Sequence, residues 1–290
     1  MEETSFTFTG SDGTEISVYR WDPAGEPKAI VQIAHGMGEH AARYRRLAEA
    51  LTDAGYVVYA SDHRGHGRTA GSADRRGDLG EGGWSALVEE VGTLGARARQ
   101  EHPDRPLVVL GHSMGSFALQ QHLLDHSGDL DAAVLSGTTA FDVLAPGIDP
   151  QAEVDLSAFN APFEPARTGY EWLSRDPDEV DKYVADPDCG FGVNAAGTAQ
   201  MVEGLGPTSD PDRLAEIRSD LPIYLMSGEA DPIAGGGPLV QLVGDRYTAA
   251  GVKDVTVDLY PEARHELFNE TNRDEVTTKL IAWLDRVVAG

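Results

Sequence analysis

Two kinds of hydrophobic pattern alternate along this chain. Short apolar or β-branched runs of four to six residues, typical of strands buried on both faces of a sheet, occur at 29–34, 56–60, 107–110, 132–135, 222–226 and 255–259. Between them, apolar residues at helical spacing predict helices around 44–51, 84–98, 116–124 and 276–287. This alternation predicts an α/β fold built on a mostly parallel sheet.

The two ends of the chain carry their own signals. Residues 5–9 and 14–20 alternate apolar and polar positions around a Ser-Asp-Gly turn, which predicts a hairpin on an antiparallel edge of the sheet. Near the C-terminus, Thr271 and Asp274 have the spacing of a capping pair, which predicts that the last helix begins there.

A long interruption separates the strand at 132–135 from the one at 222–226. The segment 138–212 holds 15 acidic and three basic residues, a formal net charge of −12, and four Asp-Pro pairs that disfavour long helices. We expect residues 1–137 and 213–290 to form the core and 138–212 to be an insertion lying over the sheet. Its aromatic residues are candidates to anchor it: Phe159, Phe163, Tyr170, Trp172 and Phe191.

Composition excludes several classes of protein. With 290 residues and 41% hydrophobic residues the chain can bury a large core, so disorder is excluded. A net charge of −25 would repel phosphate backbones, which argues against nucleic-acid binding, and a lone Cys189 cannot form an internal disulfide. No apolar run is long enough to span a membrane, and the acidic N-terminus is unlike a secretory signal, so we expect a cytoplasmic protein without stable membrane insertion.

The sharpest chemical signal is Gly-His-Ser-Met-Gly at 111–115, directly after the predicted strand 107–110. A serine on so tight a strand-to-helix turn projects its hydroxyl above the sheet, and glycines at 111 and 115 let neighbouring backbones pass closely. Ser113 is therefore the candidate nucleophile.

Such a serine needs a base and an acid that orients the base, from later strands in the order acid, then histidine. Asp231 follows the strand 222–226 and His265 follows the strand 255–259, so both lie where ligands gather in open α/β sheets. Glu229 is a competing acid, but Asp231 is favoured.

The loop after the strand 29–34 reads His-Gly-Met-Gly-Glu-His. Backbone N–H groups after this strand and after the nucleophile can stabilise a developing oxyanion. We predict that Met37 and Met114 supply these N–H groups, that Gly36 keeps the loop close, and that His35 and Glu39 order the loop.

Other motifs do not indicate a metal or cofactor. His63 and His66 sit in a loop of glycines and arginines, where hydrogen bonding to nearby loops is the expected role. The acidic series at 176, 178 and 181 lacks the glycine and glutamate of a calcium loop and predicts a solvated helix start, and the Gly-rich stretch 80–83 is no phosphate loop. We expect no metal and no cofactor.

Five motifs in order resemble the monoacylglycerol lipase and lysophospholipase branch of the α/β-hydrolase superfamily: HGMGEH at 35–40, DHRGHGRT at 62–69, GHSMG at 111–115, GEADP at 228–232 and RHELFNE at 264–270. The resemblance implies an α/β-hydrolase fold in which Ser113 is the nucleophile, Asp231 the orienting acid and His265 the base. It also implies that 138–212 is a cap, or lid, that shapes an acyl pocket. The family's usual serine after the second motif is Thr69 here, which keeps a hydroxyl.

The combined reading is a serine hydrolase of carboxylic esters, acting as a monomer or small homo-oligomer. An acidic cap differs from the apolar cap helices of lipases that dock on membranes, which favours a small neutral ester as substrate. Two alternatives stay open. One is a serine aminopeptidase of the same superfamily, whose acidic cluster would bind a free amino terminus; the other is a non-catalytic binding protein on a hydrolase fold.

Overall fold

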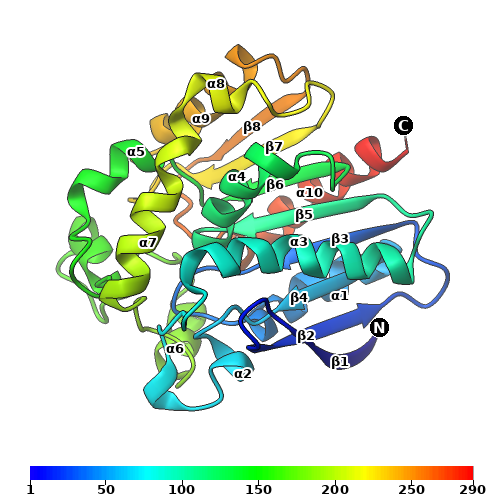
Figure 1. The fold of residues 1–290 in the computed structure, drawn as a ribbon. Helices are drawn as coiled ribbons and strands as arrows, with labels where there is room; N and C mark the ends of the chain where they lie inside the picture. Colours follow the sequence, from blue (N-terminus) through cyan, green and yellow to red (C-terminus); the bar gives the residue numbers. More distant parts are fainter. Residues whose placement is uncertain (290) are drawn as a thin grey trace.

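Eight strands form one sheet in the order β1-β2-β4-β3-β5-β6-β7-β8, within the residues 1–289 that the computed structural model describes (Figure 1). The strands are β1 (Glu2–Thr9), β2 (Glu15–Asp22), β3 (Ala29–Ala34), β4 (Tyr56–Ser61), β5 (Leu107–His112), β6 (Ala132–Ser136), β7 (Ile223–Gly228) and β8 (Val255–Tyr260). From β4 to β8 all neighbours are parallel, whereas β2 is antiparallel to both β1 and β4. The predicted α/β architecture and the N-terminal edge hairpin are confirmed.

The strand order reverses at the centre of the sheet. The chain runs from β3 outward to β4 and then returns to place β5 on the other side of β3. The loops after β3 and β5 therefore leave the sheet side by side and in opposite directions, which is where α/β sheets bind ligands.

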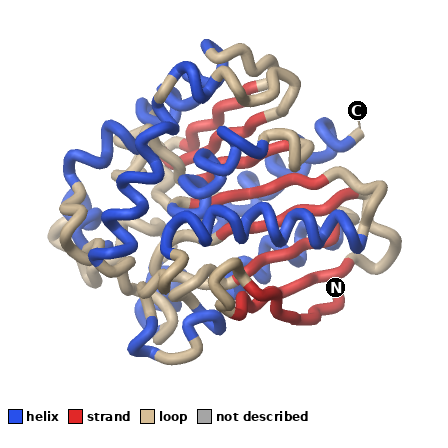
Figure 2. Tube along the Cα trace, in the orientation of Figure 1, coloured by secondary structure: helices blue, strands red, loops and turns tan. Residues whose placement is uncertain are grey.

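Helices cover both faces of the sheet (Figures 1 and 2). One face packs against α3 (Gly83–Glu101), α4 (Met114–His126) and α9 (Pro238–Ala249), and the other against α1 (Arg45–Asp53) and α10 (Arg273–Val288). A short helix, α2 (Gly67–Ala70), follows β4. Among residues 1–289, no helix combines the length and apolarity needed to cross a membrane.

The predicted capping pair of the last helix is wrong. Asn272 occupies the cap position of α10 without a side-chain hydrogen bond, and Asp274 lies inside the first turn. The Thr271 amide and hydroxyl instead donate to the carboxylate of Glu270, at 2.8 and 3.3 Å. Glu270 is fully buried, so its carboxylate cannot hydrogen-bond to water and is stabilised by these donors from Thr271.

The segment 138–212 contains helices and lies at the carboxyl ends of the parallel strands (Figure 1). Its helices are α5 (Phe141–Leu144), α6 (Pro177–Ala185), α7 (Ala195–Leu205) and α8 (Pro211–Leu214), with 3-10 turns at Ala145–Gly147, Leu156–Phe163 and Gly206–Ser209. Two Asp-Pro pairs begin helices, because Asp176 and Asp210 accept amides at the N-termini of α6 and α8 while proline occupies the first turn. The predicted helix start at Asp176 is confirmed.

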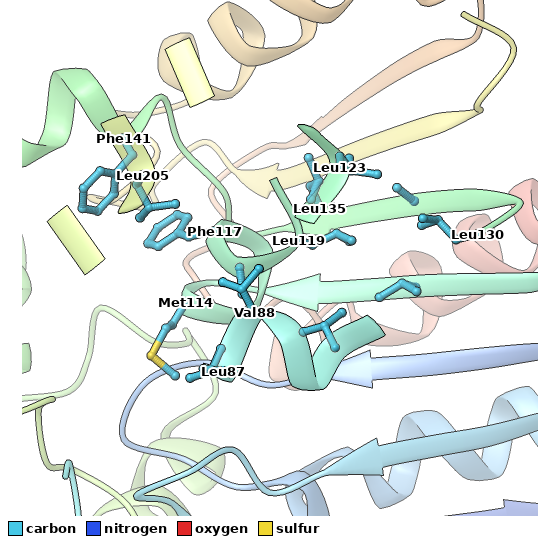
Figure 3. Packing of buried hydrophobic residues seen from close by; sticks show 14 of the residues in the cluster. Leu87, Val88, Met114, Phe117, Leu119, Leu123, Leu130, Leu135, Phe141 and Leu205 are labelled. Atoms are coloured by element: carbon cyan, nitrogen blue, oxygen red, sulfur yellow. The ribbon is translucent and has the colours of Figure 1, made fainter. Parts of the chain in front are cut away.

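Apolar side chains and ion pairs join this segment to the rest of the fold. Phe117 of α4 packs against Phe141 of α5 with ring centroids 5.4 Å apart, in a cluster that also holds Leu205 of α7 (Figure 3). Four of the segment's carboxylates pair with core arginines: Asp142 with Arg246, Asp176 with Arg273, Glu179 with Arg46, and Asp188 with Arg76.

A buried arginine fixes the N-terminal hairpin to the helical layer. The Arg64 guanidinium contacts Asp12 Oδ2 at 2.8 Å, in the hairpin turn, and Glu90 Oε1 at 2.5 Å, in α3, while donating to the Leu79 carbonyl. Both Arg64 and Glu90 are buried. Because water does not reach these two side chains, the Arg64 guanidinium and the Glu90 carboxylate each need the other to compensate their charge.

We expect Arg64→Met to lower the free energy of unfolding by about 3–5 kcal/mol, because it leaves the Glu90 carboxylate buried without a cation. Arg286→Met is the matched control: Arg286 pairs with Asp254 at 2.6 Å with half of its side chain exposed, and its loss should cost less than about 1 kcal/mol. Urea denaturation of both variants measures the difference, and equal losses would contradict the structural role of Arg64.

Candidate active site

Ser113 occupies the sharp turn between β5 and α4. Its backbone has φ 50° and ψ −120°, a strained conformation for a residue with a side chain. A Cβ at position 111 would lie 2.5 Å from the Gly115 carbonyl oxygen, and one at 115 would lie 2.1 Å from the Ala34 oxygen. Glycine is therefore required at both positions, as the sequence motif predicts.

The loop after β3 lies beside this turn. The β3–β5 register pairs Ala34 with Gly111, and a Cβ at Gly36 would lie 3.1 Å from the Cβ of Ser113. Within residues 1–289, the Met37 and Met114 amides donate to no protein acceptor. The two N–H groups predicted from the sequence thus have no protein acceptor in this range, and their residues line the same cavity as Ser113.

Asp231 and His265 meet at the ends of β7 and β8. Asp231 Oδ2 lies 2.8 Å from His265 Nδ1 and accepts the Ser227 hydroxyl at 3.0 Å, while Oδ1 accepts the Ile233 amide at 2.9 Å. Asp231 is fully buried and Glu229 is exposed, so Asp231 is the acid that contacts His265.

The pair shifts both pKa values in favour of charge. Burial acts to lower the pKa of His265, but the Asp231 carboxylate outweighs it and raises that pKa above its ordinary value. Burial likewise acts to raise the pKa of Asp231, and its bonds to His265 and to the Ile233 amide bring it below the usual range. The imidazole is held in one orientation with Nδ1 toward the carboxylate.

Ser113 and His265 line the same cavity, whose empty space of about 560 Å³ includes a part open to solvent. No hydrogen bond joins the Ser113 hydroxyl to His265 in the described part of the chain. Apolar side chains dominate the walls, and most of them come from the 138–212 segment: Phe141, Leu144, Ile148, Val154, Leu156, Phe159, Trp172, Leu173 and Met201.

One wall holds a charged cluster that the sequence analysis missed. Arg43 contacts Glu39 Oε2 at 2.7 Å and binds both oxygens of Glu266, at 2.5 and 2.7 Å. Glu39 Oε1 also accepts the Gly36 amide at 2.6 Å and the Tyr44 hydroxyl at 2.8 Å. Glu39 therefore orders the loop, as predicted. The available signals were the four-residue spacing of Glu39 and Arg43 and a glutamate directly after His265.

Trp172 and His112 cover His265 from two sides. Their rings lie 4.8 and 4.7 Å from the His265 ring, centroid to centroid. The His265 amide also donates to the Trp172 carbonyl at 3.2 Å, and the Glu266 amide donates to that of Leu173 at 2.8 Å. The segment 138–212 thus forms part of the site and holds the histidine loop directly.

The histidines near the first loop are buried; the rings of His35 and His66 hydrogen-bond to backbone, whereas His63 Nε2 has no partner among the described residues. The His63 amide donates to His35 Nε2 at 2.9 Å, and His66 Nδ1 lies 2.9 Å from the Arg64 carbonyl oxygen. Burial lowers the pKa of His63 to about 3 and that of His66 to about 4, so both rings are neutral. Thr69, the variant residue of this motif, donates its hydroxyl to the Asp62 carbonyl at 2.8 Å.

Comparison with known proteins places this geometry in context. Residues 25–272 match the protein family described as "Serine aminopeptidase, S33". The chain is 35% identical to the monoacylglycerol lipase of Mycolicibacterium smegmatis, over 96% of this chain and 95% of that protein. It is 29% identical to the monoglyceride lipase of Homo sapiens, over 90% of this chain and 82% of the human protein.

Among solved structures, a highly thermostable carboxyl esterase from Bacillus coagulans, in complex with glycerol, matches with a TM-score of 0.88. It is 28% identical to this chain, and the match covers 99% of both chains. This likeness confirms the predicted α/β-hydrolase fold.

The buried histidines predict how stability depends on pH. Burial lowers the pKa of six imidazoles, five of them buried and one, His102, half-buried: His35, His63, His66, His112, His122 and His102. Below about pH 6.5 the unfolded chain protonates these rings while the folded protein does not, so the unfolding free energy should fall from pH 7 toward pH 5. His265 opposes this trend, because its raised pKa adds stability below about pH 6.5.

Urea denaturation across this pH range measures the slope. His122→Leu should make it shallower, by up to about 1.4 kcal/mol per pH unit, because one neutral buried ring is removed. The pKa of His122 is lowered to about 4, and the residue lies outside the cavity around Ser113. A slope that is flat in the unmodified protein, or unchanged in the variant, would contradict this account.

Proposed function

Because this chain belongs to the serine aminopeptidase (S33) family and to its monoacylglycerol lipase-like branch, we propose that it hydrolyses carboxylic esters through an acyl-enzyme on Ser113. The observation that carries the proposal is His265, which lies 2.8 Å from the buried Asp231 carboxylate and lines one cavity with Ser113, Met37 and Met114.

In the proposed mechanism His265 removes the hydroxyl proton of Ser113 as the oxygen attacks the ester carbonyl carbon. The carbonyl oxygen becomes an oxyanion, which the Met37 and Met114 amides bind, each contributing about 3–4 kcal/mol to lowering the barrier. His265 then gives the proton to the departing alcohol, and water repeats the sequence to release the acid. Asp231 keeps the imidazole oriented and stabilises its charged form.

The cavity supports a neutral ester with an apolar acyl group. Its walls are mostly aliphatic and aromatic, so an acyl chain would be buried against Leu144, Ile148 and Leu156. The polar wall with Glu39 and Glu266 suits a small hydroxylated alcohol such as glycerol. We propose that residues 138–212 form a cap on the core made of 1–137 and 213–290, and that this cap sets the acyl specificity.

A serine aminopeptidase would need a carboxylate free to bind a substrate ammonium group. The two carboxylates lining the cavity, Glu39 and Glu266, are both bonded to Arg43. This pairing favours the ester over the aminoacyl substrate. A non-catalytic binding protein would not need the oriented imidazole or the strained serine. A cytoplasmic location and a monomer or small homo-oligomer stay predictions.

The acid of the proposed triad can be tested by two matched variants. Asp231→Asn should lower kcat by about 10⁴-fold, because the amide no longer holds the imidazole in the required tautomer. Glu229→Gln changes an exposed carboxylate only two residues away, and it should leave kcat within about twofold. Steady-state hydrolysis of one neutral ester measures both, and a larger loss in Glu229→Gln would reassign the acid.

Substrate class is tested with neutral esters from acetyl to palmitoyl, monoacylglycerols and one aminoacyl amide. Each buried methylene contributes about 0.8 kcal/mol, so kcat/KM should rise about fourfold per methylene until the cavity is full. Ser113→Ala should abolish turnover and labelling by a fluorophosphonate while leaving the circular dichroism spectrum intact. Retained turnover would refute the nucleophile, and fastest cleavage of the amide would identify a peptidase.

A further inference from the structure

Three side chains with metal-binding atoms meet outside the cavity, where the loop after β3 touches the 138–212 segment. His40 ends that loop, Asp186 follows α6, and Cys189 lies three residues further. One ligand atom from each lies within 4.8 Å of the other two, and His40 Nε2 is 2.9 Å from Asp186 Oδ2. Among the described residues, this group brings together an imidazole, a carboxylate and a thiol, all three of which can bind a metal ion.

Backbone bonds hold the two sides of this cluster together. The Gly190 amide and the Tyr183 hydroxyl both donate to the Gly38 carbonyl, at 3.0 and 2.8 Å. The Cys189 amide donates to the Asp186 carbonyl at 3.1 Å. The three side chains are therefore positioned by the fold before any ligand arrives, which reduces the entropy lost on binding.

We propose that His40, Asp186 and Cys189 bind a thiophilic divalent cation, zinc, with water as the fourth ligand. Imidazole nitrogen, carboxylate oxygen and thiolate sulfur are the ligands zinc takes in proteins, at about 2.0–2.3 Å, so tetrahedral ligand atoms lie about 3.5 Å apart. The three ligand atoms lie within 4.8 Å of one another, and His40 Nε2 and Asp186 Oδ2, now 2.9 Å apart, would separate as the ion binds between them. The His40 and Asp186 side chains are 14% and 31% exposed, which gives the ion a path from solvent.

Zinc binding at this site releases one proton. The Cys189 thiol loses its proton to solvent as the sulfur–zinc bond forms, and a His40 nitrogen and an Asp186 oxygen each donate an electron pair to the ion. Burial raises the pKa of this thiol, and Asp186, Glu39 and Glu266 add to the effect against Arg43. Because zinc binding releases this proton, the affinity for zinc should rise with pH.

The site joins the loop that carries Met37 to the 138–212 segment through one ion. Zinc bound there stabilises the docked arrangement of the two parts, independently of any reaction at Ser113. This inference does not rest on the proposed function.

The test is titration of the metal-free full-length protein with Co²⁺, followed by displacement with Zn²⁺. A cobalt–thiolate charge-transfer band in the near ultraviolet, saturating at one ion per chain, is the expected result. Because Cys189 is the single cysteine, the band reports this site alone. Zn²⁺ should abolish the band and raise the thermal midpoint.

Three variants and a control complete the experiment. Cys189→Ser should lose the band, and His40→Gln and Asp186→Asn should bind Co²⁺ at least about tenfold more weakly. His126→Gln removes an exposed histidine paired with Asp129 and should bind like the unmodified protein. Thermal melts of the metal-free variants verify that each is folded. Absence of the band at millimolar Co²⁺, or undiminished binding in His40→Gln and Asp186→Asn, would overturn the proposal.

Discussion

The geometry of the site depends on one buried guanidinium. Arg43 lies between Glu39, in the loop after β3, and Glu266, directly after His265. Two carboxylates out of water require a cation, and Arg43 supplies five donors in a fixed plane. Because Glu39 also binds the Gly36 amide, the His35–Gly36 peptide, one peptide before Met37, and the His265 loop are both held by the same side chain. Arg43 in turn lies 4.8 Å from the Tyr183 ring of the 138–212 segment.

Local chemistry explains what the sequence could predict. The buried strands are continuous apolar runs, and the Gly-x-Ser-x-Gly turn is defined by contacts among adjacent residues, so both are readable from short stretches. Asp231 and His265 follow because the ends of parallel strands share one edge of a sheet. The contact of Arg43 with Glu266 spans 223 residues and leaves no local pattern. Likewise, Thr271 and Asp274 have the spacing of a capping pair, but Thr271 instead donates hydrogen bonds to buried Glu270, and this burial cannot be inferred from the local sequence.

The acidic segment illustrates a different limit of sequence reasoning. Its excess negative charge is visible from composition, but the direction in which each carboxylate faces is not. Asp142, Asp176, Glu179 and Asp188 face core arginines, so part of the charge serves docking. The proposed reacting groups lie outside this segment, which supplies most of the apolar cavity wall. In the proposed enzyme, substitutions in the segment would therefore change the shape of the pocket while Ser113, Asp231 and His265 stay fixed.

At Ser113 the backbone conformation lowers the stability of the fold, and the same residue supplies the proposed nucleophile. A residue held at φ 50° and ψ −120° costs about 1–3 kcal/mol, and glycine would adopt this conformation with less strain. Replacement of Ser113 by glycine would relieve this strain and remove the proposed nucleophile in one step, so the most direct gain in backbone stability at this turn would also abolish the proposed turnover.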